Sequence, residues 1–172
     1  GLTWLKIQKI FLQLFKSNLK GMSFIMLTKQ SQDPNIELLN YVYQNAKMGS
    51  QSIAQILPKI DNQEFQSVLL DQLSQYQNIV SQASNMLSNF NASPKECMMD
   101  KLSSKAGIAF NTMTNTSTSH IAEMIINGNT MGIIDITKKI NQTEDCSQDV
   151  CNLCNDLVEI EEQNTDNMKQ FL

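Results

Sequence analysis

The sequence predicts an all-α protein, an antiparallel up-down four-helix bundle. Apolar residues recur at alternating spacings of three and four along four blocks of the chain, as they do on a helix that buries one face. Each block also begins at residues that cap helices. No stretch shows the sustained alternation of apolar and polar residues that predicts a strand, and the 172 residues include only 6 Gly and 3 Pro. We therefore expect helices throughout.

The predicted helical blocks are residues 34–57, 62–90, 94–141 and 146–171. Their starts rest on four capping sequences: Asp33-Pro34, Asp61-Asn62-Gln63-Glu64, Ser93-Pro94-Lys95-Glu96 and Asp145-Cys146-Ser147-Gln148. The polar, β-branched run at 115–119 should break the third block, with Thr118 or Ser119 capping its second half at His120. Short connections should make neighbouring helices antiparallel.

Each block carries one stripe that we expect to be buried in the core. The stripe residues are Leu39, Val42, Ala46, Gly49, Ile53 and Ile56 in the first block; Phe65, Leu69, Gln72, Tyr76, Ile79, Ala83, Met86 and Phe90 in the second; Ala122, Ile126, Asn129, Ile133, Ile136 and Ile140 in the third; and Cys154, Leu157, Glu161, Asn164, Met168 and Phe171 in the fourth. The first half of the third block is amphipathic too, and we expect it to pack across or alongside the bundle.

Charge divides the chain into an N-terminal extension, residues 1–30, and a main domain, residues 31–172. The extension holds five Lys and no acid, whereas the main domain holds eight Lys against seventeen acids, and the chain has no Arg. Because nucleic-acid binding requires a basic surface, we do not expect the main domain to bind nucleic acid.

Residues 1–30 predict a basic amphipathic helix. Trp4, Ile7, Phe11 and Leu14 form its apolar stripe. We expect it to dock on the bundle or to form a dimer contact; peripheral membrane contact through residues 1–20 is a second interpretation. A third is that translation begins at Met22 or Met26. We expect no transmembrane segment, no signal peptide and a cytoplasmic protein.

Polar residues interrupt the stripes at similar heights on three helices. A buried polar group without a partner costs about 1–3 kcal/mol, so these residues predict a shared hydrogen-bonded layer. The predicted layer consists of Gln72, Asn129, Glu161 and Asn164, joined by Asn45 and Gln75 beside the stripes.

With these polar residues, residues 34–172 resemble the ferritin-like superfamily. Its di-iron members use one Glu from each of two helices and Glu-x-x-His from each of the other two. Gln72-Leu73-Ser74-Gln75 and Glu161-Glu162-Gln163-Asn164 fall where the two Glu-x-x-His motifs would lie. Asn45 and Asn129 would replace the single Glu residues. The stretch from Ser119 through Gly128-Asn129 to Lys138-Lys139 also resembles uncharacterised bacterial ferritin-like families.

The resemblance implies a degenerate site without iron, because the set offers one carboxylate where a di-iron centre needs about four. We therefore expect no cofactor, no catalysis, and a role through assembly, as a homodimer or with a protein partner. The alternative is a metal-binding or redox-active bundle. Its candidate ligands are His120, Glu123, Cys146, Cys151 and Cys154.

Three further expectations concern cysteine, glycine and histidine. In a reducing cytosol the four cysteines should remain thiols. Gly128 and Gly132 have the spacing that lets two helices approach closely. His120, the only histidine, is expected in a first helical turn near solvent.

Overall fold

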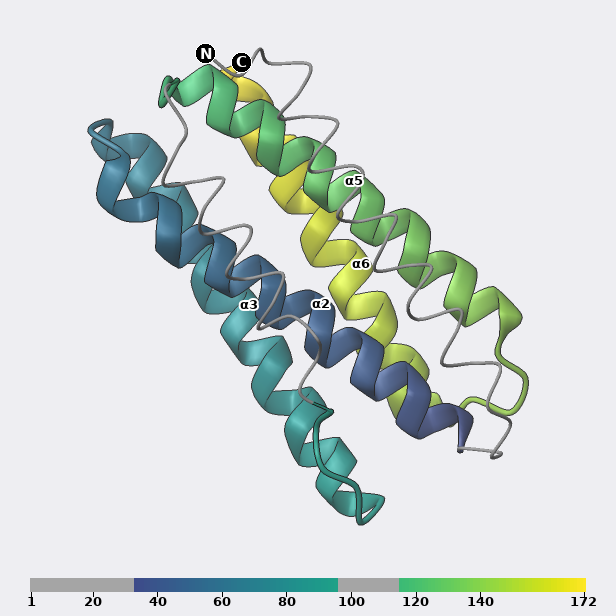
Figure 1. The fold of residues 1–172 in the computed structure, drawn as a ribbon. Helices are drawn as coiled ribbons and strands as arrows, with labels where there is room; N and C mark the ends of the chain where they lie inside the picture. Colours follow the sequence, from purple (N-terminus) through teal and green to yellow (C-terminus); the bar gives the residue numbers. More distant parts are fainter. Residues whose placement is uncertain (1–32, 96–114) are drawn as a thin grey trace.

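The computed structural model describes residues 33–95 and 115–172, and all regular structure in these two ranges is helical (Figure 1). This confirms the predicted all-α class. The elements are α2 (Pro34–Ile56), the 3-10 turn η1 (Leu57–Lys59), α3 (Gln63–Asn89), α5 (Thr118–Gln142), α6 (Gln148–Met168) and the 3-10 turn η2 (Lys169–Phe171). The predicted N-terminal helix at 1–30, residues 96–114 of the third block and Cys97 lie outside the described residues. Pro94 and Lys95, where the third block was predicted to begin, are described and are not helical.

Helix α2 begins where the sequence predicts, whereas α3 begins one residue later than predicted, with Asn62 rather than Asp61 as its N-cap. The Asp33 side chain accepts a hydrogen bond from the Asn35 backbone N–H, with Pro34 in the first turn of α2. Asn62 caps α3 by accepting from the backbone N–H of Phe65. Both caps satisfy an amide that has no partner within the helix.

The starts of the last two helices differ from the prediction by one or two residues. Ser117, not Thr118 or Ser119, caps α5, because its hydroxyl lies within reach of the backbone N–H of His120. Ser147, not Asp145, is the N-cap of α6, and its side chain makes no capping hydrogen bond. Asp145 instead adopts a left-handed backbone conformation with φ of 62°, in the turn before the helix.

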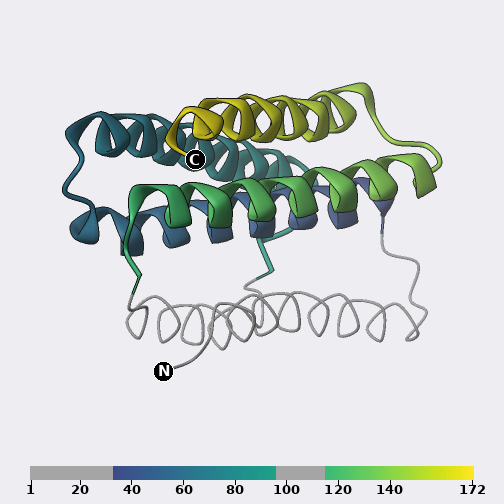
Figure 2. The same cartoon turned by 90° about the horizontal axis from the view of Figure 1, so that it is seen from above.

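The four long helices lie side by side in two layers (Figure 2). One layer contains α2 and α5 and the other contains α3 and α6. The chain turns back at residues 57–62, so that α2 packs on α3, and again at 143–147, so that α5 packs on α6. Between the two pairs, the Phe65 ring of α3 contacts the Phe171 ring near the end of the chain, with ring centroids 4.7 Å apart.

The core follows the predicted stripes, with a shift at some positions. Leu87 is buried where Met86 and Phe90 were expected to be, and these two are only half-buried. In α5, Gly132 is buried, whereas Ile133 beside it is half-buried. Ile126 and Ile140 are also half-buried. The cause is geometric: a stripe with a strict period of 3.5 residues rotates by about 20° per heptad around a straight α-helix.

No helix within residues 33–95 and 115–172 has the length and apolar content required to cross a membrane.

Candidate functional site

Four polar side chains from three helices are buried in the core between the helices. They are Gln72 of α3, Asn129 of α5, and Glu161 and Asn164 of α6, with exposed fractions of 1%, 6%, 2% and 0%. These are the residues that interrupt the apolar stripes. Because these side chains are buried, their role depends on which groups each of their polar atoms contacts.

Tyr76 of α3 connects three of these residues. Its hydroxyl donates a hydrogen bond to Oδ1 of Asn129 over 3.1 Å, and it also interacts with the side chains of Glu161 and Asn164. One turn earlier, Nε2 of Gln72 donates to the backbone carbonyl of Asn164 over 3.5 Å. We call Gln72, Tyr76, Asn129, Glu161 and Asn164 the waist cluster.

Two glycines provide the space that the waist cluster occupies. A Cβ atom on Gly132 would lie 2.5 Å from Oε2 and 2.6 Å from Oε1 of Glu161, far inside van der Waals contact. A Cβ atom on Gly49 would lie 2.9 Å from two ring carbons of Tyr76. Gly132 therefore faces a carboxyl group. Nothing lies within 4 Å of the corresponding position on Gly128, so the expected close approach of two helices at both glycines was wrong for Gly128.

Burial dominates the electrostatics of Glu161. Desolvation raises its pKa well above the ordinary value. The hydrogen bond with Tyr76 opposes this shift and the negative charge of Asp135 adds to it. Burial likewise raises the pKa of the Tyr76 and Tyr41 hydroxyls, so both remain protonated at neutral pH. With these neighbours alone, burial favours the neutral, protonated form of Glu161.

Several buried polar atoms of the waist cluster have no hydrogen-bond partner among the described residues. They are Oε1 of Gln72, Nδ2 of Asn129, Oε2 of Glu161, and both Oδ1 and Nδ2 of Asn164. Asn45 and Gln75, which the sequence placed beside this layer, are half-buried, and each also has one buried polar atom without a partner. No hydrogen bond joins either of them to the waist cluster in the described structure.

The donor set does not fit a di-iron centre. The waist cluster offers one carboxyl group, three amides and a phenol, whereas two iron ions need several carboxylates to offset their charge. Within residues 33–95 and 115–172 the structure contains no group of three or more His, Cys, Asp or Glu side chains placed to hold a metal ion.

The alternative candidate ligands do not converge on the waist. His120 lies in the first turn of α5 and is buried, with 9% exposure, which corrects the expectation that it lies near solvent. Glu123, one turn later, is half-buried. Neither residue belongs to the waist cluster.

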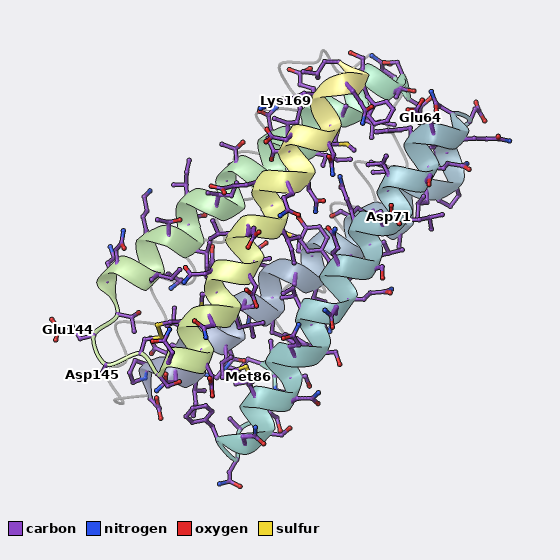
Figure 3. All side chains as sticks on the ribbon, turned by 180° about the vertical axis from the view of Figure 1, so that it is seen from behind. Glu64, Asp71, Met86, Glu144, Asp145 and Lys169 are labelled. Atoms are coloured by element: carbon purple, nitrogen blue, oxygen red, sulfur yellow. A yellow bond between two sulfur atoms is a disulfide. The ribbon has the colours of Figure 1, made fainter. Side chains whose placement is uncertain are left out.

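The cysteines also differ from the expectation of free thiols. Cys146 and Cys151 form a disulfide that joins the turn before α6 to the first turn of that helix (Figure 3). Their separation of five residues lets the first helical turn bring the two sulfurs together. Cys154 is a buried free thiol, and burial raises its pKa to about 12. A thiol with so high a pKa is a weak nucleophile and a weak metal ligand at neutral pH.

We expect reduction of this disulfide to loosen one corner of the molecule. Ser147, between the two cysteines, donates its backbone N–H to Oδ1 of Asn35 in α2 over 2.8 Å. Reduction by a dithiol should accelerate amide hydrogen exchange at residues 143–151 and lower the unfolding free energy by on the order of 2 kcal/mol or less, given the short loop. A Cys146→Ser, Cys151→Ser variant should show the faster exchange without reductant. Equal exchange before and after reduction would contradict this expectation.

The side chains that face outward are mainly polar. Glu64, Asp71 and Lys169 extend away from the helices in Figure 3. Glu159, Glu162 and Asp166 are exposed on α6, where they form a solvated acidic face of the helix.

Comparison of the chain with protein-family models, with curated proteins and with solved structures found no match.

Proposed function

We propose that the chain is a ferritin-like antiparallel four-helix bundle with a degenerate di-iron site, and that it acts without catalysis through assembly or protein contacts. The observation that carries this proposal is the chemistry of the waist cluster. A single buried carboxyl group lies among amides, at the depth where a di-iron bundle would gather its carboxylates and imidazoles.

The course of the chain supports the ferritin-like part of the proposal. In Figure 1, α3 and α5 run in one direction, whereas α2 and α6 run in the other. Twenty-eight residues, 90–117, separate α3 from α5, whereas the other two connections are short. Ferritin-like bundles combine short turns with one long crossover connection.

The chemistry of the side chains supports the non-catalytic part. Amides are neutral and poor ligands for iron, and the buried phenols of Tyr41 and Tyr76 hold their protons at neutral pH. A role through contacts with a second copy or another protein needs no chemistry at the waist. We therefore favour a homodimer or a complex with a protein partner.

We expect the protein to fail a test for ferroxidase activity. Ferrous iron added in air should give no stoichiometric uptake and no faster ferric absorbance than buffer alone. The positive control is a variant carrying Gln72→Glu, Gln75→His, Asn129→Glu and Asn164→His, which restores much of the family's ligand set around Glu161. Tight uptake of iron by the unmodified protein, abolished by Glu161→Ala, would contradict the proposal.

The proposed assembly has its own test. Light scattering coupled to size exclusion, over a hundredfold range of concentration, should give the mass of a dimer. A monomer at every concentration would leave only a complex with another protein.

One observation favours the alternative of a redox-active bundle. The Cys146–Cys151 disulfide can accept two electrons and two protons from a dithiol, and disulfides are most common in oxidising compartments. The disulfide therefore also counts against the predicted cytoplasmic location. A reversible change in oligomeric state on reduction would favour this alternative over the constitutive assembly proposed above.

A further inference from the structure

The unpartnered oxygens of the waist cluster have the composition of a cation site. Gln72 and Asn164 each have a buried amide oxygen without a partner, and Glu161 has an unpartnered carboxyl oxygen. All three side chains are at least 98% buried. Neutral amide oxygens and one carboxyl oxygen are ligands for a hard cation.

The side chain of Gln72 on α3 contacts the backbone of Asn164 on α6. Nε2 of Gln72 contacts the backbone carbonyl of Asn164, and the Tyr76 hydroxyl interacts with both Glu161 and Asn164. Gly132 leaves the carboxyl group of Glu161 the room that a side chain would fill. These contacts place the side chain of Gln72 on α3 beside the turn of α6 that carries Glu161 and Asn164.

The charge around Glu161 is not balanced by the protein. Within residues 33–95 and 115–172 Glu161 forms no ion pair. The charged group that acts on it is another acid, Asp135 of α5, and the neighbouring groups on α3 and α2 are the neutral hydroxyls of Tyr76 and Tyr41. Lys138 and Lys139 act on Asp135, so the Glu161 carboxyl group itself has no cationic partner among the described residues.

The unpartnered hydrogen-bond donors of the waist cluster are a second argument for a negative charge on Glu161. Asn129 and Asn164 each have a buried Nδ2 without an acceptor. An ionised carboxylate accepts up to about four hydrogen bonds, so amide N–H groups suit it better than they suit a neutral carboxyl group, whereas the one proton of the Tyr76 hydroxyl is donated to Oδ1 of Asn129. An ionised Glu161 in the core would then need a counterion beside it.

We infer that the waist cluster binds one monovalent alkali cation, held by the carboxylate of Glu161 and the side-chain oxygens of Gln72 and Asn164. One carboxylate balances one positive charge, whereas a divalent ion would leave an uncompensated charge in the core. The inference rests on the unpartnered oxygens and does not depend on a ferritin-like ancestry.

The test compares thermal unfolding of the full chain in choline chloride with unfolding in NaCl or KCl at the same ionic strength and pH. We expect a saturable rise of the melting temperature, roughly 5–10 °C at saturation, in the salt whose cation binds. The Na⁺ and K⁺ arms identify that cation. CaCl₂ at matched ionic strength should give no such rise.

Variants separate binding at the waist from a general salt effect. Glu161→Gln should lose the rise, whereas Glu162→Gln, which removes the neighbouring exposed acid of α6, should keep it. Gln72→Met, which retains the charge of Glu161 and deletes one neutral oxygen, should need at least tenfold more salt for the same rise. Broadening of the ²³Na resonance by unmodified protein, reversed by excess K⁺, provides a second readout.

Two results would overturn the inference. One is the same melting temperature in choline, Na⁺ and K⁺. The other is a rise that Glu161→Gln retains in full, or, if that variant does not fold, a rise unchanged by Gln72→Met. Neither result bears on the iron test, because a bundle without an alkali-ion site could still lack ferroxidase activity.

Discussion

Replacing Gly132 by valine should destabilise the protein by about 2–4 kcal/mol, which is among the largest effects expected of a single substitution in this chain. The Cβ atom alone would lie within 2.8 Å of three atoms of the Glu161 carboxyl group. Glu161 is 2% exposed and lies among packed helices, so its side chain can move away only by displacing other core residues. Urea unfolding followed by circular dichroism measures the loss.

The chain contains a matched control for this substitution. Gly128 lies one turn earlier on α5, and nothing would touch a Cβ atom there. Gly128→Ala should therefore stabilise α5 by about 0.5–1 kcal/mol, because alanine favours a helix over glycine. The helix propensities are similar at the two positions, so a difference in sign isolates the contact with Glu161.

A double variant tests whether the carboxyl group is the cause. In a Glu161→Ala background the space facing Gly132 is open, so a second substitution, Gly132→Ala, should cost at least 1 kcal/mol less than it does in the unmodified protein. If Gly132→Val were as stable as the unmodified protein, Glu161 could not lie against α5 as described.

The helices were predictable from the sequence because their signals are local. Asp33 and Asn62 bind amides two or three residues away, and stripe periodicity is a property of one helix. Polar residues in such stripes are buried for the same reason as their apolar neighbours. Gln72, Asn129, Glu161 and Asn164 could therefore be assigned to the interior before their partners were known.

The contacts that join the waist cluster could not be predicted in this way. The bond from Tyr76 to Asn129 depends on how α3 and α5 are rotated and shifted relative to each other, and periodicity within one helix carries no information on either. A signal for Tyr76 did exist, because a buried tyrosine hydroxyl usually finds a partner. The position of Gly132 against Glu161 likewise depends on the packing of α5 on α6.

The second large effect concerns the pH dependence of stability, and it should disappear in the Glu161→Gln variant. In the unfolded chain Glu161 ionises near pH 4.3, whereas burial raises its pKa in the folded protein. Between these two pKa values the folded state holds a proton that the unfolded state has released. The unfolding free energy should therefore fall as pH rises through this window, by about 1.4 kcal/mol per pH unit. The contribution is fully present below the unfolded pKa.

The measurement compares each variant with the unmodified protein from pH 4 to 8, so that the titration of all other groups cancels. The buffers should contain choline as the only cation in excess, since bound alkali ions would offset the loss. As the pH rises above the unfolded pKa, the unmodified protein should lose stability relative to Glu161→Gln, whereas Glu162→Gln should follow the unmodified protein. Parallel profiles for the unmodified protein and Glu161→Gln would mean that the folded protein already holds this carboxylate ionised. A compensating positive charge would then have to be present at the waist even in choline, and the neutral, protonated Glu161 described here would be wrong.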